Sequence, residues 1–522
     1  EYPLRILRFG NACRDTAHVK AFQRTSAAGS RYRLSGTHEV SSGEAMTEYD
    51  CVIGLEVHAQ LLTSTKIFCG CSTLSGMPAN TLTCPVCMGM PGVLPVLNQK
   101  VVEFGIMLGL ALNCSINCRN EFARKNYFYP DLPKGYQITQ FEHPLCEHGF
   151  VDIEREGRIK RIGITRIHME EDAGKNIHDD SRPLSYIDFN RAGVPLLEIV
   201  SEPDIASADE ATAYLKELRR ILMYLDVCDG NMEQGSLRCD ANVSVKPKGS
   251  ENLGVRTELK NMNSFRNVGR AIEFEIRRHI SILDAGGRVE QDTRLWNAAG
   301  NRTCSMRSKE ESHDYRYFPE PDLAPLNIDG AWIEDIRNDL PELPLAKKKR
   351  FQEVYGLPLY DADVLTQSRD LAAYFEQCNR FFDSPKEVSN WIMTEVLRII
   401  NDTGVDIRAF PVSAENLASL LSLVKGGTVS LSMAKDVFSQ MAATGKTADS
   451  VVQEQGLQQL SDTEQIREAV KAIIADNPGE VKKYQAGKTA LLGFFIGQLM
   501  KATKGKANPN LAQTIIKEML ES

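Results

Sequence analysis

The sequence predicts an α+β protein with a mainly antiparallel sheet in its first two thirds and all-α segments after it. Three observations support this prediction. Short runs that alternate apolar and polar residues, such as 241–245, recur before residue 338. Beyond residue 344, helical segments with serine caps follow one another and end at glycine or proline. The chain is 522 residues long, so we expect two or three domains instead of one core.

The first 45 residues differ in composition from the rest of the chain. Between Tyr2 and His38 there are seven Arg and Lys residues and one acid, Asp15. Such a segment is typical of an organellar transit peptide. It is also what an extension ahead of a start at Met46 would leave, and we favour that second interpretation. In either case we expect residues 1–45 to lack stable structure.

Residues 46–338 are predicted to form the sheet domain. Strands are expected at 50–57, 161–167 and 185–189 in addition to 241–245. Two helices are expected, at 100–112 and at 207–225. Ser207 and Glu210 have the spacing of a capping box at the start of the second helix.

Prolines at 341 and 344 mark a boundary, because proline interrupts both helix and sheet. We expect a helical domain over 339–455 and a basic helical tail over 456–522. Their helices are predicted from caps and stops: Ser384 and Pro385 before 388–400, Ser413 before a stop at 426–427, Ser430 before a stop at Gly445, and Ser461 and Glu464 before a stop at 478–479.

Composition excludes several classes of protein. The chain is 42% hydrophobic and 25% charged, as in soluble globular proteins, and no apolar run reaches the length of a membrane span. Its net charge of −8 excludes a polycation that coats nucleic acid, so RNA binding would need local basic patches. Thirteen cysteines, mostly scattered, indicate a reducing compartment.

Four cysteines form two close pairs. Cys69 and Cys71 are separated by twelve residues from Cys84 and Cys87. Two thiol pairs across a short loop predict a tetrahedral zinc site. Because four cysteine ligands leave no open position for substrate, we expect this zinc to be structural.

Three segments concentrate carboxylates near imidazole. Residues 168–175 hold one His, three acids and a Lys within eight positions. Glu56 and His58 share one face of a predicted strand, and Glu198 lies within an apolar run. Ordinary salt bridging explains any one segment alone, whereas the three together favour a Mg²⁺–phosphate site.

Six motifs, in the order of the family, resemble GatB, a component of the tRNA-dependent amidotransferase. They lie at 53–58, 124–131, 166–175, 235–242, 258–264 and 314–322, and the likeness runs from about Tyr49 to the C-terminus. The resemblance implies conversion of Glu-tRNA(Gln) or Asp-tRNA(Asn) into the amide, with ATP and with ammonia from a partner amidase (GatA-like). It also implies a small GatC-like component in a heterotrimer. Some family members carry a four-cysteine site and others lack it.

The resemblance also implies roles for individual residues. His58, Glu171 and Glu198 would be ligands of Mg²⁺, with Glu56 a near neighbour; because imidazole is an unusual magnesium ligand, His58 could instead hold a water. Lys125 and Lys175 would neutralise phosphate oxygens. The expected mechanism forms an acyl phosphate, which ammonia then converts to the amide. A bacterial-type protein would be cytoplasmic, and a transit peptide would direct it to a mitochondrion or plastid.

Two enzyme motifs are missing. Gly445-Lys446-Thr447 and Gly487-Lys488-Thr489 both lack the upstream glycine of a phosphate-binding loop. An amidase signature is also missing, so the chain is not expected to release ammonia from glutamine itself.

The last 43 residues carry seven lysines and three glutamates, which is consistent with a solvated helix face. Against the chain's negative net charge we favour contact with tRNA phosphates, to which Lys501, Lys504 and Lys506 would contribute. Two rival classes remain: a non-catalytic RNA-binding scaffold, and a stand-alone metal-dependent hydrolase.

Overall fold

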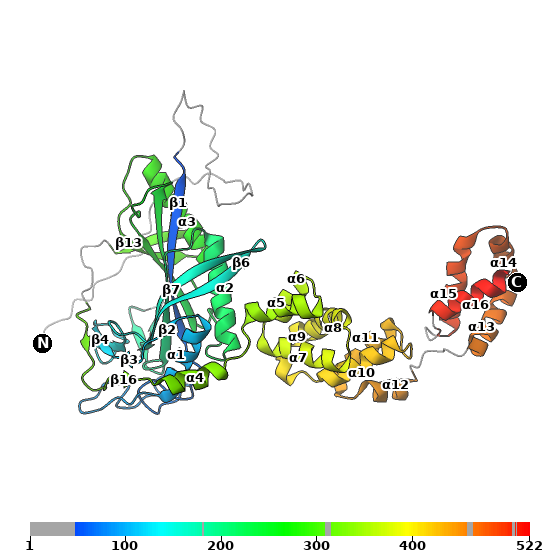
Figure 1. Cartoon of the computed structure of the whole chain (residues 1–522), viewed down its shortest axis with the longest axis horizontal. Helices are drawn as coiled ribbons and strands as arrows, with labels where there is room; N and C mark the ends of the chain where they lie inside the picture. The colour runs from blue at the N-terminus through cyan, green and yellow to red at the C-terminus, as the bar shows by residue number, and fades with distance from the viewer. Residues whose placement is uncertain are drawn as a thin grey trace, which may run out of the picture. The chain divides into compact units, whose positions relative to one another are not determined.

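In the computed structural model, the structure describes residues 47–179, 182–307, 315–456, 463–503, 507 and 509–521 (Figure 1). The leader predicted at 1–45 lies outside these residues, as do Ser461, Lys504 and Lys506. The chain divides into two compact units between Leu343 and Pro344. The expected boundaries at 338 and 455 therefore stay predictions.

Within the described residues of the first unit, nine strands form one sheet in the order β14-β13-β12-β11-β1-β10-β7-β6-β2. Its neighbours pair antiparallel except β12 with β13, which confirms the predicted fold class. The strands are β1 (Tyr49–Gln60), β2 (Ser115–Ile116), β6 (Cys146–Arg155), β7 (Arg158–Glu171), β10 (Pro195–Ser201), β11 (Leu237–Pro247), β12 (Thr257–Lys260), β13 (Asp292–Asn297) and β14 (Arg302–Arg307).

Alternation along β1 divides the sheet into an apolar and a polar face. Ile53, Leu55 and Val57 are fully buried, whereas the residues between them are only partly covered. Because side chains alternate along a strand, Glu56 and His58 lie on the opposite face. The apolar face joins one core with helices α1 (Gln99–Ala111), α2 (Ala208–Tyr224) and α3 (Phe265–Asp284).

The predicted start of α2 is confirmed, with one difference in its cap. The Ser207 hydroxyl accepts a hydrogen bond from the Glu210 backbone N–H at 3.2 Å. The Glu210 carboxylate accepts from the backbone N–H of Ala206 at 2.8 Å, one residue ahead of the position that a capping box would use. Both interactions satisfy N–H groups that an uncapped helix end leaves unpaired.

Helix α3 is not among the helices predicted above, although Ser264 caps it and Val268, Ala271, Ile272 and Ile276 form its buried stripe. This helix connects β12 to β13, the parallel pair of the sheet. Parallel neighbours need such a crossover, so α3 must cross the sheet. Its first turn therefore follows directly from the end of β12.

Smaller elements flank the large sheet. Loop strands pair as β15-β4-β5, β16-β3 and β8-β9. These strands are β3 (Arg119–Asn120), β4 (Ala123–Asn126), β5 (Tyr136–Thr139), β8 (Lys175–His178), β9 (Ser185–Asp188), β15 (Phe318–Pro319) and β16 (Leu326–Asn327), and helix α4 (Gly330–Asn338) follows them.

The second unit is helical in its described residues, as predicted. The caps at Ser413 and Ser430 both accept a backbone N–H, and Gly445 ends its helix in the left-handed conformation with φ of 70°. The helices are α5 (Pro344–Tyr355), α6 (Leu359–Leu365), α7 (Arg369–Phe381), α8 (Pro385–Trp391), a π-helix (Ile392–Val396), α9 (Leu397–Thr403), a 3₁₀ turn (Ile407–Ala409), α10 (Ala414–Lys425), α11 (Leu431–Thr444) and α12 (Ala448–Gln455).

A separate hydrophobic core lies near the C-terminus. It gathers Ile466, Phe495, Leu499 and Ile516 with their neighbours, and it shares no residue with the core of α5–α12. Its elements are α13 (Thr463–Asp476), α14 (Pro478–Gln485), a 3₁₀ turn (Thr489–Leu491), α15 (Leu492–Ala502) and α16 (Pro509–Glu521). In the part of the chain that the structure describes, no helix combines the length and the apolar character of a membrane span.

A buried charge network fixes α3 to the last strands of the sheet. Glu275 is fully buried and accepts hydrogen bonds from Arg278 at 2.7 Å and from Thr303 on β14 at 3.0 Å. His279 lies 3.2 Å from the same carboxylate. Burial alone would raise the pKa of Glu275, but hydrogen bonds from His279 and Arg278 and the charge of Arg278 lower it to about 2.

We expect Glu275→Gln to lower the free energy of unfolding by about 3 kcal/mol at pH 7, because breaking a buried charge pair leaves its partners uncompensated. The depressed pKa stabilises the folded state above the ordinary value of 4.5, and this contribution is lost as pH falls toward 2. Urea denaturation at pH 7 and at about pH 3 should therefore show a smaller difference at the lower pH. Glu273→Gln, which removes a surface partner of Arg277 on the same helix, is the control; equal effects of the two variants would contradict the prediction.

Candidate functional site

The polar face of the sheet brings charged residues of three strands into one row. His58 on β1 lies directly opposite Glu198 on β10, and Glu198 lies directly opposite His168 on β7. The imidazole Nε2 of His58 is 3.1 Å from Glu198 Oε2, and that of His168 is 3.4 Å from the same oxygen. Antiparallel pairing thus assembles residues that are up to 140 positions apart in the sequence.

Glu170 completes the cluster. Its Oε1 lies 3.5 Å from His58 Nε2, and Glu170 and Glu198 are both buried. Burial alone would lower the pKa of His58, but its hydrogen bond to Glu198 and the charge of Glu170 raise it. Burial likewise works against ionised Glu198, yet the charge and hydrogen bond of His168 keep the pKa of Glu198 well below its ordinary value.

The predicted grouping of Glu171 with His58 and Glu198 is corrected by this geometry. Glu171 follows Glu170 on β7, so its side chain leaves the strand toward the opposite face. There it pairs with Lys134 and accepts the backbone N–H of Ile138 at 2.8 Å. The three groups that could jointly hold a metal ion are His58, Glu170 and Glu198, whose donor atoms lie within 4.8 Å of one another.

The other predicted residues of the site are not all brought to this cluster. Glu56 lies two residues before His58 on the same face and accepts a hydrogen bond from Asn242 at 2.9 Å. Burial and the charge of Glu198 raise the pKa of Glu56. Lys125 lines the cleft beside Glu170. Lys175 is exposed on β8 and is not among the residues that line the cleft.

A cleft of about 440 Å³ opens beside the cluster. Arg191 and Arg238 both reach it and both pair with the buried Asp172, at 3.5 and 3.0 Å. Burial alone would raise the pKa of Asp172, but the two guanidinium charges lower it. Gln60 on β1 donates to the same carboxylate at 2.8 Å, so this carboxylate fixes both arginines in the cleft.

Lys125 differs from the other cations of the cleft. Lys260 pairs with Asp240 at 2.5 Å, and the two arginines pair with Asp172. Among the described residues, Lys125 forms no such ion pair; its ammonium lies 4.8 Å from the ring centre of Tyr315. Burial alone would lower its pKa, but the charge of Glu170 raises it. Lys125 therefore presents a positive charge that is available to an anionic ligand.

Sequence reasoning missed the aromatic wall next to Lys125. The Asn126 backbone donates to Tyr315 O at 2.9 Å, which joins two motifs almost 190 residues apart. The Tyr317 ring stacks on Phe141 with centres 4.0 Å apart. The recurrence of tyrosine in both motifs was a signal, but only the pairing of β4 with β15 brings the rings together.

The four predicted cysteines lie together. Cys69, Cys71, Cys84 and Cys87 place their sulfurs within 4.8 Å of one another. A hydrogen bond from Cys69 lowers the pKa of Cys87, whereas burial raises that of Cys71. The Cys84 backbone N–H also points at Cys87 Sγ, at 3.2 Å. Four converging thiols without a fifth donor fit zinc by number and by softness.

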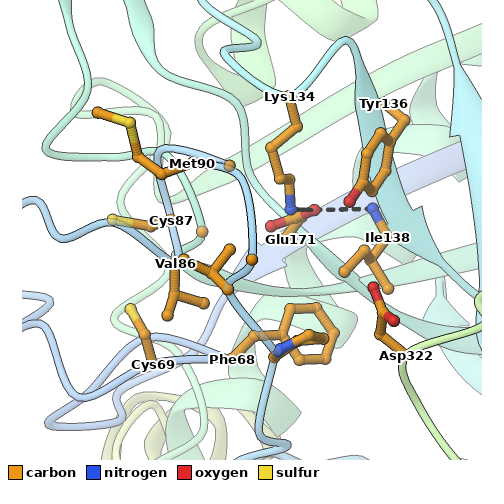
Figure 2. A pocket seen from close by; sticks show the side chains of 15 residues that line it. Phe68, Cys69, Val86, Cys87, Met90, Lys134, Tyr136, Ile138, Glu171 and Asp322 are labelled. Atoms are coloured by element: carbon orange, nitrogen blue, oxygen red, sulfur yellow. Dashed lines mark hydrogen bonds and ion pairs between the residues drawn. The ribbon is translucent and has the colours of Figure 1, made fainter.

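A smaller pocket of about 200 Å³ separates this cluster from the Glu171–Lys134 pair. Figure 2 shows Cys69, Val86, Cys87 and Met90 on one side and the dashed pair of Glu171 and Lys134 on the other. Glu171 therefore belongs to a second polar position beside the cysteine loop, on the other side of β7 from His58.

Comparison with known proteins shows the family. The model of the GatB/GatE catalytic domain matches residues 51–334, and that of the GatB domain matches residues 373–520. A protein of Thermodesulfovibrio yellowstonii is 56% identical over 474 residues, which is 91% of this chain and 100% of the relative. One of Geotalea uraniireducens is 57% identical over 476 residues, 91% and 99% of the two chains. Both relatives are aspartyl/glutamyl-tRNA(Asn/Gln) amidotransferase subunits of the GatB type. The chain belongs to the GatB family.

We expect the purified protein to contain close to one zinc ion per chain. Cys84→Ser should lower both the zinc content and the melting temperature, because binding to a structural site adds to the free energy of folding. Metal analysis and thermal melts measure the two effects. Cys118→Ser, which changes an exposed cysteine outside the cluster, is the control. Zinc-free protein whose four thiols all react freely with a thiol reagent would contradict the assignment.

Proposed function

We propose that this chain supplies the amide-forming site of a tRNA-dependent amidotransferase. Its substrate would be Glu or Asp esterified to tRNA(Gln) or tRNA(Asn), with ATP as the activating reagent. A GatA-like amidase and a GatC-like protein would complete the complex, and the amidase would deliver ammonia. The observation that supports this most is the convergence of His58, Glu170 and Glu198 beside the uncompensated charge of Lys125 in a member of the GatB family.

The proposed reaction has two steps. A carboxylate oxygen of the aminoacyl side chain attacks the γ-phosphorus of ATP, and ADP leaves with the electron pair of the broken P–O bond. Ammonia then attacks the acyl carbon, and inorganic phosphate leaves as the C–N bond forms and a proton is lost. Neither step requires a covalent bond to the protein, so positioning and charge are what the chain must provide.

The donor set fits Mg²⁺. Two buried carboxylates converge on one point, and their like charges need a cation between them. Glu170 and Glu198 would hold the ion, with His58 as a third ligand or as the holder of a bound water. When bound, Mg²⁺ would bridge phosphate oxygens and reduce their charge.

The remaining cations of the cleft would orient the substrates. Lys125 would face the oxygens of the transferred phosphoryl group, since it lies next to Glu170 and is free of carboxylate partners among the described residues. Arg191 and Arg238, held by Asp172, would contact the outer phosphates or the aminoacyl group. Such preorganised charges act where negative charge develops in the transition state.

We expect Glu170→Gln to slow acyl-phosphate formation by about a hundredfold or more, because it removes one charge from the metal site at nearly constant volume. Binding of misacylated tRNA should change less than about twofold, since that contact lies elsewhere. Phosphate release with ATP and misacylated tRNA, and amide formation with ammonium chloride, measure the two steps separately.

Glu202→Gln is the matched control, because Glu202 follows β10 but bonds to Thr165 and not to the cluster. Full activity of Glu170→Gln would sink the metal assignment. Phosphate release by the wild-type protein that does not depend on misacylated tRNA would favour a hydrolase, and tRNA binding without any phosphate release would favour a scaffold.

The C-terminal residues are proposed to bind the tRNA body. The third core includes Ile466 and Val470 on α13, so a cut before Pro478 would divide it. A chain that ends at Gly456 removes that core as a whole. We expect this truncation to weaken tRNA binding and to flatten its dependence on salt, because fewer phosphate contacts release fewer counterions. Affinities at several salt concentrations decide the point; equal slopes would mean that the tail makes no phosphate contacts.

A further inference from the structure

Lys66 is a fully buried lysine beside the cysteine cluster. Its side chain has a relative exposure of 0%. The ammonium Nζ lies 2.8 Å from the carbonyl oxygen of Leu82, 3.5 Å from that of Phe189 and 3.7 Å from Cys87 Sγ. These three partners belong to the cysteine loop and to the turn that precedes β10.

The partners indicate the charge state that this nitrogen carries. Two are carbonyl oxygens, which only accept hydrogen bonds, and the third is a sulfur that accepts as a thiolate. Three acceptors match the three donors of an –NH₃⁺ group. Within the described residues no carboxylate lies within ion-pair distance of Lys66, and a buried ammonium without an opposite charge is strongly unfavourable.

We infer that Lys66 is the counter-charge and positioning residue of the four-cysteine metal site. This inference rests on the proposed zinc site. Zinc with four thiolates carries two negative charges in excess, and a charge of this kind in a buried site needs compensation. The Lys66 ammonium supplies it through Cys87, while the excess charge of the thiolates offsets the cost of burying the ammonium.

The same side chain connects the metal site to the cleft. Ile67 donates its backbone N–H to Gly193 O at 3.0 Å, and Lys66 holds Phe189 O from the other side. Between these two points lies Arg191, whose guanidinium bonds Ala173 O at 3.0 Å and pairs with Asp172 in the cleft. Lys66 thus fixes the turn that presents Arg191 to the substrates.

Lys66→Met tests the inference, because methionine keeps the length of the side chain and removes the charge. Zinc affinity, measured by competition with a chromogenic chelator, should fall about ten- to a hundredfold, the usual effect of losing an outer partner of a metal site. The melting temperature of the zinc-loaded protein should fall. That of the stripped protein should stay the same or rise, because the stripped site lacks the charge that compensates Lys66. A merely structural lysine would lower both.

Two further variants separate the possible outcomes. Lys100→Met removes a lysine that pairs with Glu103 on the surface of α1, and its zinc affinity should equal that of the wild type. Lys66→Arg keeps the charge and should retain zinc better than Lys66→Met, which keeps the test open if the methionine variant folds poorly. Equal zinc affinity of Lys66→Met and wild type would overturn the role of Lys66. Absence of zinc from the wild type would instead overturn the metal site itself.

The connection to the cleft has its own readout. Hydrogen–deuterium exchange of the backbone at residues 189–193 should be faster in zinc-loaded Lys66→Met than in the wild type, and unchanged in Lys100→Met. Equal exchange in Lys66→Met and wild type would contradict the positioning of Arg191 by Lys66.

Discussion

The cross-strand register of β1, β10 and β7 is the constraint on which the site depends. His58, Glu198 and His168 meet because each lies directly opposite the next across an antiparallel pair. A slip of one residue in either pairing would turn these charges into the core and expose Val57 and Ile199. The apolar face therefore enforces the polar one: the free energy that buries the alternate residues of β1 against the helices also sets the position of every ligand atom.

Charge compensation explains why so many ionised groups are tolerated in one place. Asp172 is balanced by Arg191 and Arg238, and Asp240 by Lys260. Glu170 and Glu198 have only imidazole groups within ion-pair distance among the described residues. That local excess of negative charge distinguishes a place for a cation from the surrounding structural ion pairs.

Much of the fold could be predicted from the sequence, and the site only in part. Alternation identified β1, serine caps identified the C-terminal helices, and cysteine spacing identified the cluster. The choice of Glu171 over Glu170 failed because the predicted strand ended at 167, whereas β7 continues to Glu171. Extending the strand by alternation from His168 would have selected Glu170. The pairing of Tyr315 with Asn126 and the contact of Lys66 with Phe189 depend on tertiary structure, which local patterns do not encode.

The crossover through α3 has a consequence for the substrate side of the cleft. Asn261 and Asn263 line the cleft in the short loop between β12 and α3. One end of this loop continues a paired strand and the other enters a capped helix, while Asn261 holds a left-handed backbone with φ of 68° and donates its side-chain amide to Trp296 O. Such a segment has little conformational entropy left to lose when a ligand arrives. This wall of the cleft is thus a rigid template, and the adjustment needed to admit two large substrates must come from the substrates themselves or from other walls.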